Sequence, residues 1–322
     1  MEFLPTTLAE GKQYYNDFTQ FDVVFITGDP YYDHPLSGIA ILSRLLNYKG
    51  YKVGIIGQPL SDEDFQVCGK PKYFFCITSG LLDSMLANYT PMLRKRDGVL
   101  VPERALMVYT QKVKQFFKGS ITVLGGVEAT IRRFTHFDYK ENTLRRGILN
   151  DTKADLLLFG NAERSILTLL ERLQKLQSEN QTFDQLKLKL NLKSIDGTSF
   201  RIKKEELDPA IRLLPSFEEC IQDKEKFSLL TRVHYLLPDD PFIEPCGLGF
   251  IQHNRPAHTL QEAEMDLIYG FPYTRKLHPN TKNIQFNQDM VGKLEASIVI
   301  GRGCWGSCNF CVIPLVQGKE VA

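Results

Sequence analysis

The stretch DVVFITGDPYYDHPLSGIAILSRLLNYKGYKVGIIG, residues 22–57, decides the fold class of this chain. Its two ends, DVVFIT (22–27) and KVGIIG (52–57), are short apolar runs of the kind that form strands covered on both faces. Between them, residues 35–49 carry apolar side chains at helical spacing, with proline at the first position and glycine directly after the last. A strand, a helix and a strand in this order predict a βαβ unit.

The same alternation continues to about residue 177. Three further apolar runs predict strands: YFFCIT (73–78), ITVLGG (121–126) and DLLLFG (155–160). Amphipathic stretches predict helices over 103–118 and 162–177, the second capped by Asn161. Residues 1–177 are therefore expected to form a Rossmann-like α/β domain, in which helices flank a mostly parallel sheet on both faces.

The pattern changes after residue 177, and residues 178–295 are expected to be an α+β connector or accessory region. We expect four features there: a hairpin at Asp196-Gly197 within LKLKLNLKSIDGTSFRI (186–202), a helix near 217–236, an irregular stretch around EPCGLGFIQHNRPAH (244–258) and a helix near 260–268. The apolar run ASIVI (296–300) then predicts a new strand, with which residues 296–322 begin a further domain.

Composition excludes several classes of protein. Hydrophobic residues at 43% and charged residues at 24% are ordinary for a globular chain, and a formal charge of +1 does not indicate a nucleic-acid or membrane-surface partner. The sequence shows neither a secretory signal nor an apolar run long enough to span a bilayer, so we expect a cytoplasmic protein.

The stretch GRGCWGSCNFC (301–311) places Cys304, Cys308 and Cys311 at C-x₃-C-x₂-C spacing. Structural zinc usually takes four protein ligands in two pairs, and here only a distant His278 or Cys246 could supply the fourth. Ordinary ferredoxin clusters also take four cysteines. A [4Fe–4S] cluster held by three thiolates would keep one iron without a protein ligand, and that iron could bind a small molecule.

This loop, which follows an apolar run and has Phe310 before its last cysteine, resembles the cluster loop of the radical SAM superfamily. Segments along nearly the whole chain are similar to the YgiQ-like family of radical SAM proteins. They are FLPTT (3–7), GDPYYDHPLSGIAI (28–41), GYKVGIIGQP (50–59), DSMLANYT (83–90), GGVEATIRRFTHFDY (125–139), ADLLLFGNAER (154–164), LLPSFEE (213–219) and FPYTRKLHP (271–279). The resemblance implies a Rossmann-like domain followed by a partial TIM barrel.

The resemblance also implies the cofactors. Cys304, Cys308 and Cys311 would each ligate one iron of a [4Fe–4S] cluster, and the fourth iron would bind S-adenosylmethionine. An electron from an external donor would cleave S-adenosylmethionine into methionine and a 5′-deoxyadenosyl radical, with Phe310 beside the adenine. Cobalamin is not expected, because Asp33-His34 lacks the Asp-x-His-x-x-Gly spacing of cobalamin-binding relatives, and these two residues are expected to initiate the helix at 35–49.

Other candidate ligand-binding residues follow the ends of expected strands, where open α/β sheets bind their ligands. They are Gly125, Gly126, Glu128, Gly160 and Glu163. The glycines are also what any strand-to-helix turn uses, and the glutamates are also favoured in a first helical turn. Dinucleotide and P-loop motifs are absent from the sequence.

The βα units of a complete barrel do not follow the cysteines. We therefore expect the N-terminal portion of a YgiQ-like protein, inactive without a downstream radical SAM polypeptide. Its substrate and catalytic residues stay undefined. Two alternatives remain: a noncatalytic protein that binds zinc or an iron–sulfur cluster, and a Rossmann-like ligand-binding module or partner subunit.

Overall fold

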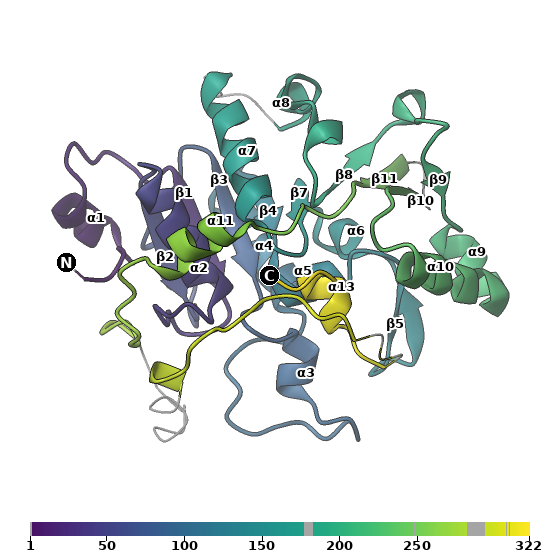
Figure 1. Ribbon diagram of the computed structural model, residues 1–322, viewed down its shortest axis with the longest axis horizontal. Helices are drawn as coiled ribbons and strands as arrows, with labels where there is room; N and C mark the ends of the chain where they lie inside the picture. Colours follow the sequence, from purple (N-terminus) through teal and green to yellow (C-terminus); the bar gives the residue numbers. More distant parts are fainter. Residues whose placement is uncertain (1, 177–182, 248, 282–293, 307, 309) are drawn as a thin grey trace.

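The computed structural model describes residues 2–176, 183–247, 249–281, 294–306, 308 and 310–322 (Figure 1). Its main strands are β1 (Val23–Thr27), β2 (Val53–Gly57), β3 (Phe74–Thr78), β4 (Ile121–Leu124), β7 (Leu156–Leu158), β8 (Thr198–Ile202), β9 (Arg212–Leu213), β10 (Phe242–Cys246) and β11 (Gly249–His253). They form one sheet in the order β2-β1-β3-β4-β7-β8-β11-β10-β9. Two short strands, β5 (His136–Asp138) and β6 (Thr143–Arg145), pair separately.

The first five strands of the sheet, β2-β1-β3-β4-β7, are mutually parallel, as the apolar runs predict. Val23 of β1 lies opposite Val53 on one side and Phe74 on the other. The pairings of β8 with β7 and with β11, and of β10 with β11, are antiparallel. The fold is thus mixed α/β with a large, mainly parallel sheet.

Helices cover both faces of the parallel strands (Figure 1). The helices of the described residues are α1 (Leu8–Tyr14), α2 (Gly38–Tyr48), α3 (Ser84–Asn88), α4 (Ala105–Phe116), α5 (Gly126–Ile131), α6 (Ile148–Thr152), α7 (Glu163–Lys175), α8 (Phe183–Leu190), α9 (Phe217–Gln222), α10 (Lys224–Leu236), α11 (Glu262–Tyr269) and α13 (Ile313–Gln317). Single 3₁₀ turns occur at Asp64–Gln66, Leu192–Ser194 and Lys204–Glu206.

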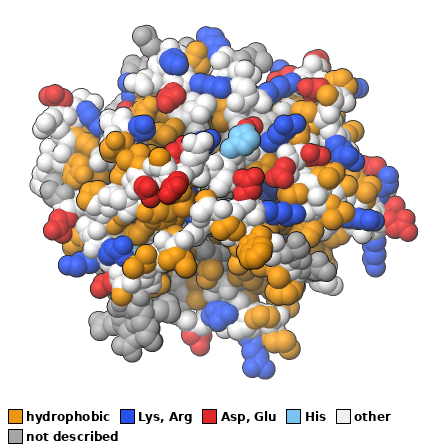
Figure 2. All heavy atoms as spheres, in the orientation of Figure 1, with side chains coloured by type: hydrophobic (Ala, Val, Ile, Leu, Met, Phe, Trp, Pro, Cys, Tyr) orange, Lys and Arg blue, Asp and Glu red, His pale blue; other side chains and the backbone are white. Residues whose placement is uncertain are grey.

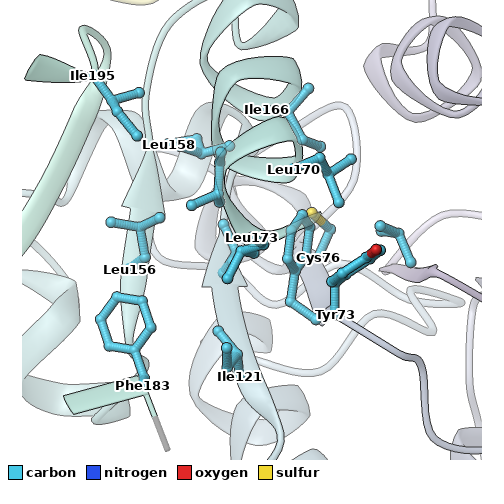
Figure 3. Packing of buried hydrophobic residues seen from close by; sticks show 14 of the residues in the cluster. Tyr73, Cys76, Ile121, Leu156, Leu158, Ile166, Leu170, Leu173, Phe183 and Ile195 are labelled. Atoms are coloured by element: carbon cyan, nitrogen blue, oxygen red, sulfur yellow. The ribbon is translucent and has the colours of Figure 1, made fainter. Parts of the chain in front are cut away.

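Two hydrophobic cores result from the strict alternation of side chains along the strands. Phe25 of β1 joins the core under α2, α7 and α8, part of which Figure 3 shows around Leu170 and Leu173. Its neighbour Ile26 joins the opposite core with Tyr109 of α4. Every residue of β1 is buried, because both faces of the strand are covered.

Helix α2 begins three residues later than expected. Asp33 and His34 do not initiate it: the His34 carbonyl accepts the Ser37 N–H in a turn that precedes the helix. Ser37 is the N-cap residue. Asn161 is likewise not the cap of α7, since Ala162 occupies that position and the Asn161 side chain donates to the Gln317 carbonyl instead.

The prediction of a hairpin at Asp196-Gly197 is wrong. Residues 183–190 form helix α8, and β8 pairs with β7 and β11 rather than with the preceding segment. A run with leucine at every second position also has leucines four residues apart, and Leu186 and Leu190 are both fully buried in the helical form. Tertiary burial therefore overrides the alternating pattern.

Three other expectations also differ from the structure. The helix near 217–236 is two helices, α9 and α10, separated at Asp223. The stretch expected to be irregular contains the antiparallel pair β10 and β11. The run at 296–300 is not a strand, and Ile300 is 99% exposed. A strand requires a neighbour for its backbone hydrogen bonds, and residues 297–300 have no strand partner in the described part of the chain.

The domain boundary expected at residue 177 lies outside the described residues. Strands from either side of it, β7 and β8, pair in one continuous sheet, and the division of the chain into domains stays a prediction. In the described ranges, every helix is too short or too polar to cross a membrane.

Candidate functional site

A cleft of about 440 Å³ opens at the carboxyl ends of the parallel strands. It lies where the strand order reverses around β1, the place where open α/β sheets bind ligands. The ends of β1, β3, β4 and β7 and the residues that follow them line it, among them Asp29, Thr78, Gly125, Gly126, Gly160 and Glu163. Four of the five residues that the sequence placed at strand ends are thus brought together here.

The two adjacent glycines of the cleft, Gly125 and Gly126, are under different structural constraints. Gly126 has φ +82°, and a β-carbon there would lie 2.3 Å from Oγ1 of Thr78, so only glycine fits. Gly125 has an extended backbone with φ −158°. A β-carbon at Gly125 would meet nothing closer than the Leu158 carbonyl oxygen, at 3.8 Å. The missing side chain of Gly125 therefore leaves open space in the cleft.

Glu128, the remaining strand-end candidate, is 1% exposed and does not line the cleft. Its carboxylate accepts the Ser84 N–H at 2.8 Å. Burial, with the neighbouring Asp83 carboxylate, raises the pKa of Glu128. Asp83 in turn pairs with Arg132. The structure thus turns the carboxylate of Glu128, a residue of α5, toward the start of α3 and away from the cleft lining.

Asp29 is a cleft residue that the sequence reasoning missed. Its carboxylate accepts the Leu81 N–H at 2.6 Å, which links the loops after β1 and β3. Burial raises the pKa of Asp29. Its position two residues beyond the apolar run at 22–27 was the available signal, because a polar residue there falls at the carboxyl edge of the sheet.

The segment that leads into the cysteines covers part of the cleft. Arg302 donates from Nη1 to Oε1 of Glu163 at 2.5 Å and from Nε to the Tyr269 hydroxyl at 2.6 Å. The side chains of Arg302 and Glu163 are 9% and 7% exposed, so the ion pair is buried. Helix α13 packs against α5 from the same side (Figure 1). The sequence offered no signal for Arg302 beyond its charge.

The expected cysteine ligands lie on the loop just beyond this ion pair. Cys308 is exposed, and Cys304 and Cys311 are half-buried. A β-carbon at Gly306 would lie 3.4 and 3.7 Å from the sulfurs of Cys304 and Cys308, so these two thiols turn toward the same open side of the loop. The Cys311 N–H donates to the Cys308 carbonyl oxygen at 3.1 Å.

In the part of the chain that the structure describes, no three His, Cys, Asp or Glu side chains converge as a metal site. The donor set nevertheless fits an iron–sulfur cluster, since it consists of three accessible thiols on one tight loop. The surroundings of this loop are apolar and exposed: Trp305 is 86% and Phe310 is 91% exposed. Figure 2 shows hydrophobic side chains spread over this face among acidic and basic ones.

The other residues weighed as ligands have structural partners. Asp33 is fully buried and pairs with Arg44, and it also accepts the Thr274 N–H at 2.9 Å. His34 is fully buried, and its Nδ1 accepts the Leu36 N–H. His278 packs against the rings of Phe3 and Tyr31. None of the three lies in a metal-binding group of the described residues.

Comparison with known proteins identifies related sequences. Residues 3–291 match the family described as "Radical SAM N-terminal". A UPF0313 protein of Methanocaldococcus jannaschii is 37% identical over 334 residues, covering 99% of this chain and 52% of the relative. A UPF0313 protein of Geobacter sulfurreducens is 37% identical over 337 residues, covering 100% and 53%. The chain thus spans about half the length of the curated relatives it matches.

The chain is also similar, more distantly, to a solved structure. It is the radical S-adenosylmethionine methyltransferase TsrM from Kitasatospora setae with a tryptophan substrate and an S-adenosylmethionine analogue bound. The match has a TM-score of 0.37 and 12% identity, and covers 56% of this chain and 29% of TsrM. Similarity at this level carries no argument about the function of the chain.

Proposed function

We propose a function from one premise, that this chain belongs to the YgiQ-like (UPF0313) family of radical SAM proteins. In this proposal the chain is the cluster-binding N-terminal part of a radical SAM iron–sulfur enzyme. The observation that carries it is the C-x₃-C-x₂-C loop, three accessible thiols in a member of this family. The activity of the whole enzyme and its substrate belong to the proposal.

Cys304, Cys308 and Cys311 are the proposed cluster ligands. A [4Fe–4S] cluster bound there supplies an iron for S-adenosylmethionine and, from an external donor, the electron that cleaves it to a 5′-deoxyadenosyl radical. Phe310 is proposed to lie beside the adenine. Phe310 has little packing of its own, which leaves the ring accessible to such a partner.

Arg302 is the proposed anchor of this loop. It lies two residues before Cys304, and its buried pair with Glu163 ties the start of the loop to the carboxyl edge of the sheet. A buried charge that lost its partner would be strongly unfavourable, so the pair resists displacement of this segment. The anchor supports a defined position for the first cluster ligand relative to the cleft.

The test is anaerobic reconstitution with iron and sulfide. We expect about four of each per chain, with the visible absorption of an iron–sulfur cluster. The variants Cys304→Ala, Cys308→Ala and Cys311→Ala should each lose the cluster. Cys246→Ala is the matched control, because Cys246 is also half-buried but belongs to strand β10, and it should load normally. Unchanged iron loading in Cys308→Ala would refute the proposal.

The same measurement distinguishes the proposed iron–sulfur protein from the zinc-binding alternative. A noncatalytic zinc protein would contain stoichiometric zinc when purified in air and would not take up iron and sulfide together. The position of His278 between aromatic rings argues against it as a fourth ligand of the cysteine loop. The remaining alternative, a ligand-binding module, is supported by the cleft and leads to a separate inference.

A further inference from the structure

The cleft at the sheet edge has the properties of a built small-molecule site. Its volume of about 440 Å³ is within the range of pockets that enclose a small organic ligand. Aliphatic side chains supply much of its wall, including Ile39 and Leu42 of α2. These two side chains are only half-buried although they belong to the apolar face of the helix, so an apolar ligand could complete their burial.

The open space above Gly125 is a second indication. Neither its backbone conformation nor its neighbours require glycine at this position, in contrast to Gly126. A side chain at Gly125 would project from the carboxyl end of β4 between the loops that line the cleft. The absent side chain is therefore explained by the space that it leaves for a ligand.

Two carboxylates provide the polar contacts. Glu163 is 5% exposed and lines the cleft, and its Oε2 atom is buried without a hydrogen-bond partner among the described residues. An unpartnered buried carboxylate oxygen is unfavourable unless a ligand donates to it. Asp29 lines the same cleft and has one carboxylate oxygen engaged with the Leu81 N–H.

The hydrogen-bonding groups of the cleft decide which ligands fit. Arg302 neutralises Glu163, and Asp29 has no cationic partner among the described side chains that line the cleft. The starts of α2, α5 and α7 all border the cleft without a side-chain cap, and each contributes partial positive charge. When ionised, the Glu163 and Asp29 carboxylates only accept hydrogen bonds, so they favour a ligand that donates and disfavour phosphates and carboxylates, which present acceptors.

We propose that this cleft binds a neutral or cationic small molecule that has an apolar body and an amine or hydroxyl group donating hydrogen bonds to Glu163 and Asp29. Val299, Gly301, Arg302 and Gly303 form part of its wall, so the bound molecule lies beneath the segment that leads to Cys304. The sheet edge supplies much of the rest of the wall, and Cys304, Cys308 and Cys311 do not line the cleft, so the site does not require the cluster. Its existence is therefore independent of the proposed function.

Three probes with one apolar body test this inference: 2-phenylethylamine, 2-phenylethanol and phenylacetate. Titration calorimetry or ligand-observed NMR on the whole chain should show saturable binding of the amine and the alcohol, and much weaker binding of phenylacetate. Asp29→Asn keeps the shape and the acceptor for Leu81, and should weaken binding of the amine about tenfold, because a charge-assisted hydrogen bond becomes neutral.

Two substitutions at Gly125 test the location. Gly125→Leu should fill the space and abolish binding, whereas Gly125→Ala adds one methyl group in ordinary contact and should retain most of it. Melting temperature verifies that each variant is folded, and Asp29→Asn provides a second test if Gly125→Leu is not. Binding of the amine should survive simultaneous replacement of Cys304, Cys308 and Cys311 by alanine.

Three results would overturn the inference: phenylacetate binding as tightly as the amine, full affinity in folded Gly125→Leu, or no saturable binding of any probe at millimolar concentration. Iron loading of the same variants is measured separately. If the probes do not bind but iron loading is normal, the inference about the cleft fails and the proposed cluster site stands. If the probes bind but iron is not taken up, the cluster proposal fails and the inference about the cleft stands.

Discussion

Glu244 is a buried carboxyl group outside the cleft lining. It is 2% exposed, its Oε1 accepts the Thr135 N–H at 3.0 Å, and its Oε2 lies 3.7 Å from Nε2 of His253. Burial raises the pKa of Glu244 to about 7. Nearby, burial lowers the pKa of Arg133 to about 9. These buried polar groups lie where β10 and β11 meet the segment that follows α5, and none of them lines the cleft.

The folding stability of the chain should depend on pH through Glu244. In the unfolded chain Glu244 ionises near 4.5, and in the folded chain near 7. Between these values the unfolded chain releases a proton that the folded chain keeps, so this contribution to stability is lost as pH rises. The stability of Glu244→Gln relative to the wild type should therefore rise by about 3 kcal/mol between pH 4.5 and 8, as measured by urea unfolding.

Glu218→Gln is the control for this experiment, because its stability relative to the wild type should change with pH in the opposite direction. Its hydrogen bond with Arg146 lowers the pKa of Glu218, so its contribution is present at neutral pH and lost in acid. Both side chains are nearly half exposed, and the effect should stay below about 1 kcal/mol. If the free energies of unfolding of Glu244→Gln and the wild type change equally with pH, the raised pKa of Glu244 is contradicted.

At the scale of an element, helix α8 shows how burial decides whether a run of alternating leucines forms a strand or a helix. In a strand, the alternating leucines of this segment would all share a single face. In the helix, Leu186 and Leu190 are one turn apart and both join the core beneath α7. The polar Asp184 and Lys189 face outward. The helix thereby covers part of one face of the sheet without adding an exposed strand edge.

Truncation of Leu186 should therefore be costly. Leu186→Ala removes a fully buried side chain and leaves a cavity, with an expected loss of about 2–5 kcal/mol in the free energy of unfolding. Lys189→Ala, on the exposed side of the same helix, should change stability by less than about 0.5 kcal/mol. Denaturant titration of both variants measures the difference. Equal effects would show that Leu186 does not pack into the core in solution.

At the scale of the whole molecule, the described chain places the cysteine loop at its surface. Ile300, Trp305 and Phe310 are large apolar side chains with little burial, and the relatives are about twice as long as this chain. Exposed apolar side chains concentrated on one segment are typical of a surface that another polypeptide covers. S-adenosylmethionine, if the proposed cluster binds it, would remain in contact with water at such an exposed loop.

We predict that this chain, even when loaded with iron and sulfide, does not catalyse multiple turnovers of S-adenosylmethionine cleavage. Holding a reacting group in position can account for about 7–11 kcal/mol of a barrier, and the exposed loop offers few contacts for this. Anaerobic product analysis with dithionite should detect multiple turnovers to 5′-deoxyadenosine for a full-length relative, such as the M. jannaschii protein, but not for this chain. Comparable turnover by the two would contradict the prediction.

The sequence by itself determined the parallel strands, the helices α4 and α11, and the cysteine spacing. Each depends on residues that are close together in the chain: a buried parallel strand is a continuous apolar run, and a helix shows its period within two or three turns. The resemblance to the radical SAM family came from the same local motifs, and the comparisons confirm it.

Only the tertiary structure decided what depends on distant residues. Whether 186–190 is helical depends on the core that buries Leu186, and whether 296–300 is a strand depends on a partner for its backbone. The ion pair of Arg302 with Glu163 joins residues 139 positions apart, and Asp29 enters the cleft because the order of the strands brings its loop beside those after β3 and β4. No local pattern encodes such pairings, because their free energy arises only once the sheet has assembled.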